Sequence, residues 1–141
     1  MTMELGDGDR GRRIRPEGVI TCKQDHDMPR EILKRALSIR QPLSEQILTG
    51  EKTEEYRAQL THKRERVYLY AGKKVAQVDE FTEEEAAALP RSAIVGSVEI
   101  VGCHWDEEKD CFAWELANPI RFPEPLVVHG VPQPGFWFPK F

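Results

Sequence analysis

The segment Gly50–Arg57 gathers more groups capable of chemistry than any other stretch of the chain. If residues 53–57 form a strand, Glu55 and Arg57 point to one face and Tyr56 points to the other. Lys52 lies at the corner before the strand, where its long side chain can fold over either face. An arginine offers a planar fork to a phosphate or a base edge, and a glutamate accepts from a base amino group. The spacing alone is compatible with an ion-pair ladder on the surface or with the lining of a ligand cleft.

A short helix is expected to position this segment. Ala36–Ile39 is a strand-like run that stops at Gln41, because the residue before a proline is pushed away from helical geometry. The proline suits a first helical turn, and apolar residues then recur at helical spacing up to Gly50, where a helix end favours a positive φ. We predict a helix over Pro42–Thr49, after which Gly50 turns the chain into the next strand.

The rest of the chain reads mostly as short strands. Val67–Ala71 alternates aliphatic and tyrosine side chains, the period-two pattern of a half-buried strand. Further β-prone runs follow at Ala93–Val101, Cys111–Leu116, Leu126–Val128 and Phe136–Phe138. Six or more short strands with two brief helices predict an α+β, mainly β fold, a small β-barrel with helical plugs.

The acidic run after Thr82 has the pattern of a helix start. Thr82 and Glu85 form a capping box before an alanine-rich turn that Pro90 ends, and the acidic side chains complement the helix dipole. We therefore interpret the run as a solvated helix start and not as a metal site. The scattered Cys and His residues do not have tetrahedral ligand spacing, so we expect no metal and no cofactor.

Residues 1–34 mix Gly, Asp, Arg and Glu without sustained periodicity, apart from a possible short strand at Gly18–Ile20. We predict a flexible N-terminal arm over 1–34 and one domain over 35–141. The arm is either an extension without a role or a basic segment that touches a polyanion. In the second case the contacts would come from Arg10, Arg12, Arg13 and Arg15.

Charge is distributed unevenly along the 141 residues, whose net charge is −4. Residues 36–78 carry eight Lys/Arg against five Asp/Glu, whereas residues 79–115 carry two against eleven. A globally acidic protein is a poor non-specific binder of nucleic acid, but a locally basic face can hold one short strand or one nucleotide. Three cysteines without an export signal favour reduced thiols in the cytoplasm, and no apolar run is long enough to span a bilayer.

Several motifs together resemble the ASCH domain family of the PUA-like superfamily. The run Ala36–Pro42 leads into a Gly-x-Lys-x-x-Glu-x-Arg pattern, which Gly50, Lys52, Glu55 and Arg57 meet in full. The runs Tyr68–Ala71, Ala93–Glu99 and Phe112–Leu116, with the closing Gly135–Trp137, also fit. The resemblance covers residues 35–139. It implies a PUA-like barrel with short helices packed at a cleft, and RNA or a modified nucleotide as the partner.

The resemblance implies cleft roles for Arg40, Lys52, Glu55 and Arg57. Arg40 has the alternative of bonding helix-end carbonyls. Lys73 and Lys74 follow a strand end and could reach phosphates, although exposed lysines often serve only solubility. Tyr68 and Trp137 could stack on a base, but a core role is favoured for Trp137. The oligomeric state expected is a monomer or a weak dimer.

An enzyme is the alternative to a binding module. Some ASCH-type proteins resemble amidohydrolases that remove the acetyl group of N4-acetylcytidine, with a threonine three residues after the motif lysine. Here that position is Glu55. Thr53 directly follows Lys52, so its side chain leaves the backbone in a different direction from that of a residue three positions on. A carboxylate cannot replace a hydroxyl nucleophile without another mechanism. If the chain is a hydrolase of this kind or a ribonuclease, Lys52 and Glu55 are the expected acid/base pair.

Overall fold

The computed structural model describes residues 33–141, where the chain forms one six-stranded sheet and two short helices. The predicted arm, with its possible strand and its arginines, lies outside the described residues except for its last two positions. The elements, in chain order, are β2 (Ala36–Gln41), α2 (Leu43–Thr49), β3 (Glu54–Arg57), β4 (Arg66–Val75), α3 (Glu83–Ala87), β5 (Ala93–Asp106), β6 (Cys111–Leu126) and β7 (Phe136–Trp137).

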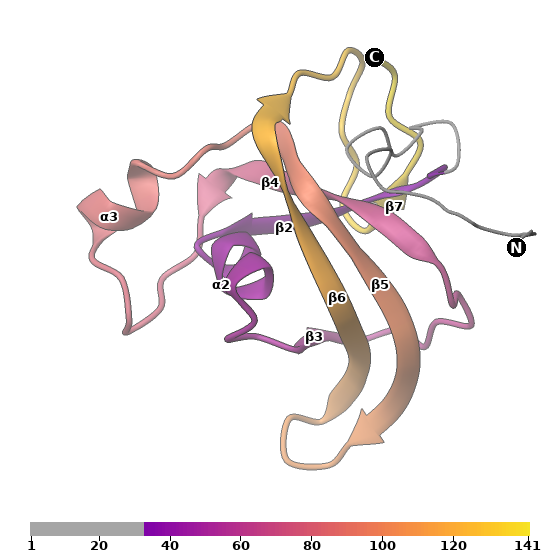
Figure 1. Cartoon of the computed structure of the whole chain (residues 1–141). Coiled ribbons are helices and arrows are strands. Elements are labelled where there is room, and N and C mark those ends of the chain that lie inside the picture. The colour runs from indigo at the N-terminus through magenta and orange to yellow at the C-terminus, as the bar shows by residue number, and fades with distance from the viewer. Residues whose placement is uncertain (1–32) are drawn as a thin grey trace, which may run out of the picture. The chain divides into compact units, whose positions relative to one another are not determined.

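The sheet has the strand order β3-β6-β5-β4-β2-β7. Strands β2 and β4 are parallel, and every other neighbouring pair is antiparallel. The sheet curls into a half-barrel, and β5 and β6 form a long hairpin that extends past the other strands (Figure 1). This arrangement confirms the predicted mainly β class with short helices. Strands β3 and β7 are the two ends of the order, so the curled sheet leaves an opening between them.

Helix α2 ends at Thr49 as predicted, but it begins at Leu43, one residue later than predicted, because Pro42 is its N-cap. Gln41 caps its first turn, because the side-chain Oε1 accepts a hydrogen bond from the backbone N–H of Glu45 at 3.0 Å. The helix ends at Gly50, which has a φ of 89°, a left-handed conformation that costs glycine little. Ile47 is 1% exposed and packs into the main core, a burial that stabilises the fold by roughly 1.5–3 kcal/mol.

Over Val67–Ala71, strand β4 is buried on both faces, so the expectation of a half-buried strand there is wrong. Val67, Leu69 and Ala71 belong to a core cluster with α2. Tyr68 and Tyr70 point the other way, into a second cluster that includes Trp137. The chain after β6 packs against the face that carries Tyr68 and Tyr70. It therefore covers two tyrosines that the alternating pattern would leave exposed to solvent.

The remaining elements agree with the predictions in part. Thr82 caps α3 with a complete capping box, as expected, but the helix stops at Ala87, before Pro90 is reached. The run Leu126–Val128 is not a separate strand, because Leu126 is the last residue of β6. Among the described residues, none of the helices is both long enough and apolar enough to cross a bilayer.

Candidate functional site

Strand β3 separates the polar side chains of the Gly50–Arg57 segment onto two faces, as its alternation predicts. Glu55 pairs with Trp114 and Arg57 pairs with Phe112 on β6, which places these four side chains on the inner face of the curled sheet. Tyr56 lies on the outer face, where its hydroxyl donates to Glu54 Oε1 at 2.8 Å.

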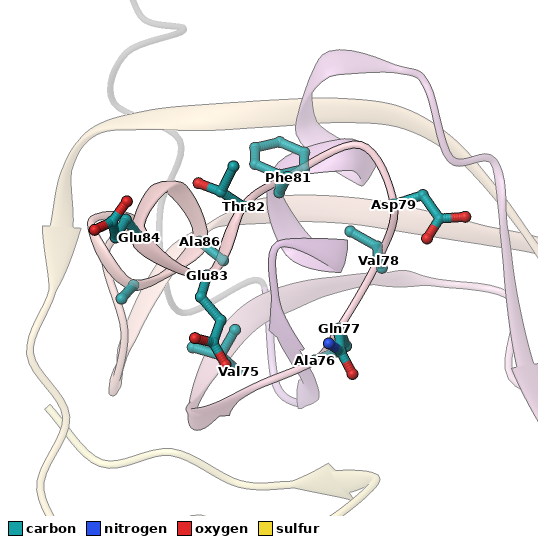
Figure 2. Close-up of a pocket in the computed structure, with 11 residues that line it drawn as sticks. Val75, Ala76, Gln77, Val78, Asp79, Phe81, Thr82, Glu83, Glu84 and Ala86 are labelled. Carbon is teal, nitrogen blue, oxygen red and sulfur yellow. The ribbon is translucent and has the colours of Figure 1, made fainter.

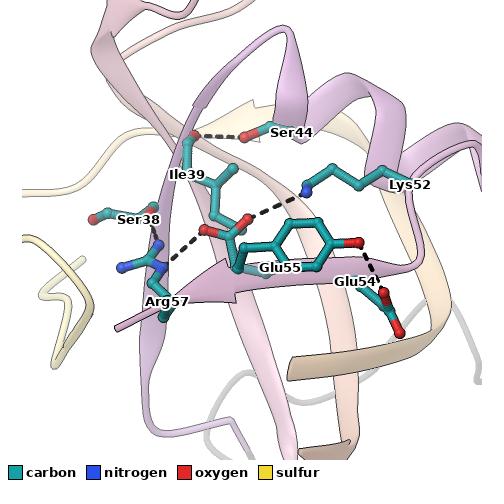
Figure 3. Close-up of polar contacts among 8 residues, drawn as sticks. Ser38, Ile39, Ser44, Lys52, Glu54, Glu55 and Arg57 are labelled. Atoms are coloured by element: carbon teal, nitrogen blue, oxygen red, sulfur yellow. Dashed lines mark hydrogen bonds and ion pairs between the residues drawn. The ribbon is translucent and has the colours of Figure 1, made fainter. Parts of the chain in front are cut away.

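The carboxylate of Glu55 lies between two cations. Arg57 Nε donates to Glu55 Oε2 at 2.8 Å, and Lys52 Nζ lies 3.6 Å from Oε1 (Figure 3). Glu55 is only 8% exposed, so its charge requires partners on both oxygens. The structure therefore brings the three charged residues of the motif together in one cluster, with the glutamate as its centre.

Arg57 also joins β3 to β2 across the opening of the sheet. Its Nη2 donates to the backbone carbonyl of Ser38 on β2 at 2.7 Å, and its guanidinium lies 5.7 Å from the ring centre of Trp114. Ser38 in turn is held by the chain around β7, because its hydroxyl donates to the carbonyl of Gln133 and accepts from Trp137 Nε1. Arg57 thus has a structural role in closing the half-barrel as well as a place in the candidate site.

A cleft of about 810 Å³ opens beside this cluster. Its charged lining consists of Arg40, Glu55, Arg57, Lys73 and Lys74. Arg40, Lys73 and Lys74 are exposed and make no ion pair or hydrogen bond through their side chains within residues 33–141. The helix-end carbonyls that could have held Arg40 are not its partners. Lys52 does not line the cleft, although its ammonium group contacts Glu55, which does.

Tyr68 and Trp137, the two candidate stacking residues, both lie in the second core cluster. Tyr68 is 1% exposed and Trp137 is 6% exposed, so neither ring presents a face to a base. Tyr70 packs edge-on against Trp137, with the two ring centres 5.2 Å apart, and it also lines the cleft. We therefore leave Tyr68 and Trp137 out of the site, since long-range packing has made them core residues.

Part of the cleft comes from residues that the sequence did not single out. Its far wall is the segment 132–135, Pro-Gln-Pro-Gly, and its floor includes Gly72. A proline- and glycine-rich segment just before an aromatic strand is typical of a loop. Its own residues, however, do not indicate that it lies opposite Arg57. The backbone N–H of Ser38 donates to Gly135 O at 3.1 Å, which fixes that segment against β2.

The outer face of the same strands carries a separate polar network. The hydrogen bond to Glu54, together with burial, raises the pKa of Tyr56 to about 12. His104 Nδ1 contacts Glu115 Oε2 at 2.7 Å, and this contact raises the pKa of the imidazole above its ordinary value of 6.5. Along β3 and β6 these residues alternate with Glu55, Arg57 and their partners on the inner face. They therefore lie on the opposite face of the sheet from the cleft.

A second cavity of about 800 Å³ lies between the end of β4 and α3 (Figure 2). It is lined by apolar residues such as Val78 and Phe81 and by the carboxylates of Asp79, Glu83 and Glu84. It contains none of the predicted site residues. Within residues 33–141, no group of three or more His, Cys, Asp or Glu side chains could hold a metal ion, and Cys103 and Cys111 are free thiols.

Comparison with known proteins assigns this chain to a family. The ASCH domain family matches residues 37–126, which is more than half of the chain. The crystal structure of ASCH from Zymomonas mobilis superposes with a TM-score of 0.50 at 15% identity, covering 74% of this chain and 85% of that one. At this identity the similarity supports the fold alone. No curated protein matches the sequence. The matched range includes the whole Gly50–Arg57 segment and strands β3, β4, β5 and β6, and this chain is a member of the ASCH domain family, a PUA-like fold.

Proposed function

We propose that the cleft binds single-stranded RNA or a modified nucleotide. The observation that carries the proposal is the lining itself, in which one buried carboxylate and its arginine partner adjoin three cations that are unpaired within residues 33–141. Single-stranded nucleic acid is recognised by a basic groove together with polar groups that reach base edges. A cleft of about 810 Å³ also lies in the usual size range of small-molecule sites.

Arg57 and Glu55 are the groups suited to a base. Two nitrogens of Arg57 are engaged, Nε by the glutamate and Nη2 by the Ser38 carbonyl, so Nη1 keeps its donors for a ligand. The guanidinium is held from two sides, which reduces the entropy lost when it binds. Glu55 lines the cleft, and a carboxylate oxygen there can accept a hydrogen bond from an exocyclic amino group.

Hydrolysis is not part of the proposal. The hydroxyl of Ser38 lines the cleft, but it is bonded to the Gln133 carbonyl and to Trp137 Nε1 and has no base beside it. The carboxylate of Glu55 is committed to two cations. Binding without turnover is the function that these contacts support best.

The test is a titration of the protein with a labelled single-stranded RNA hexamer and with N4-acetylcytidine at low salt. Arg40→Ala and Lys73→Ala should each weaken RNA binding and reduce the slope of log K against log salt by about 0.7. Their exposed side chains make them better probes than Arg57, whose removal would disturb the fold. Lys140→Ala is the control, since this exposed lysine does not line the cleft.

Two outcomes bear directly on the proposal. Absence of binding by the wild-type protein to both ligands at low salt would refute it. Equal losses in Arg40→Ala and Lys140→Ala would show that the cleft is not the binding surface. Mass spectra of both ligands after incubation complete the test, because unchanged masses are expected from a binding module.

A further inference from the structure

We infer that the two ends of the cleft take different parts of one ligand. The end beside Arg57 takes the nucleobase, and the end beside Arg40 takes a phosphate group. The inference rests on the proposed function. It restricts the ligand to phosphorylated molecules, namely nucleotides or RNA strands, and disfavours free nucleosides.

The backbone register is the first observation. Between Ile39 and Gln41 the pairing of β2 with β4 shifts, so that one residue of β2, Arg40, lies opposite residues 72–74 of β4. A bulge of this kind bends a strand, redirects its side chains and occurs often at functional sites. Here it brings Gly72, Lys73 and Lys74 to the side of Arg40, and all four residues line the cleft.

The second observation is that these cations have no partners. Of the seven arginines between residues 33 and 141, Arg40 is the one whose guanidinium contacts no carboxylate, carbonyl, hydroxyl or ring within that range. Lys73 and Lys74 likewise have free ammonium groups there. Three unpaired charges of one sign repel one another, and a bound phosphate would relieve that repulsion with charge-assisted hydrogen bonds.

The third observation is that the other end of the cleft carries an acceptor suited to a base. The carboxylate of Glu55 lines the cleft there and can accept a hydrogen bond from a base amino group, whereas the side chains of Arg40, Lys73 and Lys74 can only donate. Leu43, which is partly exposed, supplies an apolar side chain to the cleft lining.

The spacing of the two ends fits one nucleotide. Along β2, Ser38 and Arg40 are two residues apart, and along the parallel β4, Tyr70 and Lys74 are four apart. At about 3.3 Å per residue the ends are therefore separated by roughly 7–13 Å. This length accommodates a base, its ribose and one phosphate.

The experiment compares ligands with and without the phosphate. The four common ribonucleosides and N4-acetylcytidine are titrated by calorimetry and NMR, each as the nucleoside, as its 5′-monophosphate and as a dinucleoside monophosphate. We expect at least one phosphorylated form to bind tenfold or more tightly than its nucleoside. Preference for the 5′-monophosphate would identify a mononucleotide ligand, and preference for the dinucleoside monophosphate would identify an RNA strand.

A double variant tests where the phosphate is held. Lys73→Ala/Lys74→Ala should lower the affinity for the phosphorylated ligand toward that of the nucleoside, with Arg40 still in place, and should leave nucleoside binding unchanged. Lys34→Ala/Lys140→Ala removes the same charge at exposed positions that do not line the cleft and should change neither affinity.

The outcomes separate this inference from the function on which it rests. Equal affinity of nucleosides and nucleotides would overturn the phosphate end and leave nucleoside binding in the cleft intact. Equal loss for both ligand types in Lys73→Ala/Lys74→Ala would also overturn it. Failure of every ligand to bind would overturn the proposed function and the inference together.

Discussion

Gly72 offers a direct test of the cleft, because a Cβ can be added there without a clash. A Cβ at this position would meet no atom within 4 Å, and its φ is not in the left-handed region. Gly72 lies within β4 and lines the cleft. The series Gly72→Ala, Gly72→Val and Gly72→Phe therefore fills the cleft stepwise from its floor.

The expected effects on stability and on binding have opposite signs. A glycine inside a strand costs roughly 0.5–1 kcal/mol relative to alanine, so Gly72→Ala should raise the free energy of unfolding by about that amount. For a domain of this size the melting temperature should rise by about 2–8 °C. The ring of Gly72→Phe brings about 150–250 Å² of side-chain surface to the cleft floor. RNA affinity should then fall tenfold or more, which corresponds to about 1.4 kcal/mol.

The assay combines thermal melting with RNA titration for each variant. Gly96→Ala is the contrasting control, because its Cβ would overlap the Ile120 carbonyl oxygen and approach Leu48 Cδ2 at 2.8 Å. It should lower the melting temperature, since overpacking costs about 1–3 kcal/mol. If Gly72→Phe melts like the wild type and binds RNA equally well, the ligand does not occupy this cleft.

Other perturbations test the contacts around the site. Arg57→Ala should lower the free energy of unfolding by about 2–3 kcal/mol in urea denaturation, because it leaves a buried carboxylate short of a partner and removes the contact between β3 and β2. Lys52→Ala should cost only about 0–1 kcal/mol, as its ion pair is longer, and a loss as large as that of Arg57→Ala would contradict this ranking. The raised pKa of His104 predicts that its contribution to stability is complete below about pH 6.5 and declines as the pH rises through the folded-state pKa. In Glu115→Gln an NMR titration of the imidazole should show the pKa return toward 6.5, and an unchanged pKa would argue against the contact as its cause. Thr82→Ala should destabilise the fold by about 1 kcal/mol through loss of the cap, and an unchanged melting temperature would mean that α3 contributes little to global stability.

The features that depend on near neighbours could be predicted from the sequence alone. The helix before Gly50, the left-handed glycine at its end and the capping box at Thr82 all follow from interactions within a few residues. The alternation that brings Glu55 and Arg57 to one face follows equally from strand geometry. The ASCH assignment rests on the same short motifs, so the order of the residues was enough to support it.

Only the tertiary structure decided which of these residues face solvent and which face the core. Tyr68 and Trp137 have the chemistry of base-stacking residues, but the chain after β6 covers them, and no local pattern encodes that return. The contact between Arg57 and the Ser38 carbonyl joins residues 19 positions apart across the opening of the sheet.

The grouping of Arg40 with Lys73 and Lys74 has the same origin. These residues are far apart in the sequence, and they become neighbours because a parallel pairing of β2 and β4 shifts register at a bulge. The Gly50–Arg57 segment could be recognised from its own residues, whereas the cleft beside it exists only because the sheet curls.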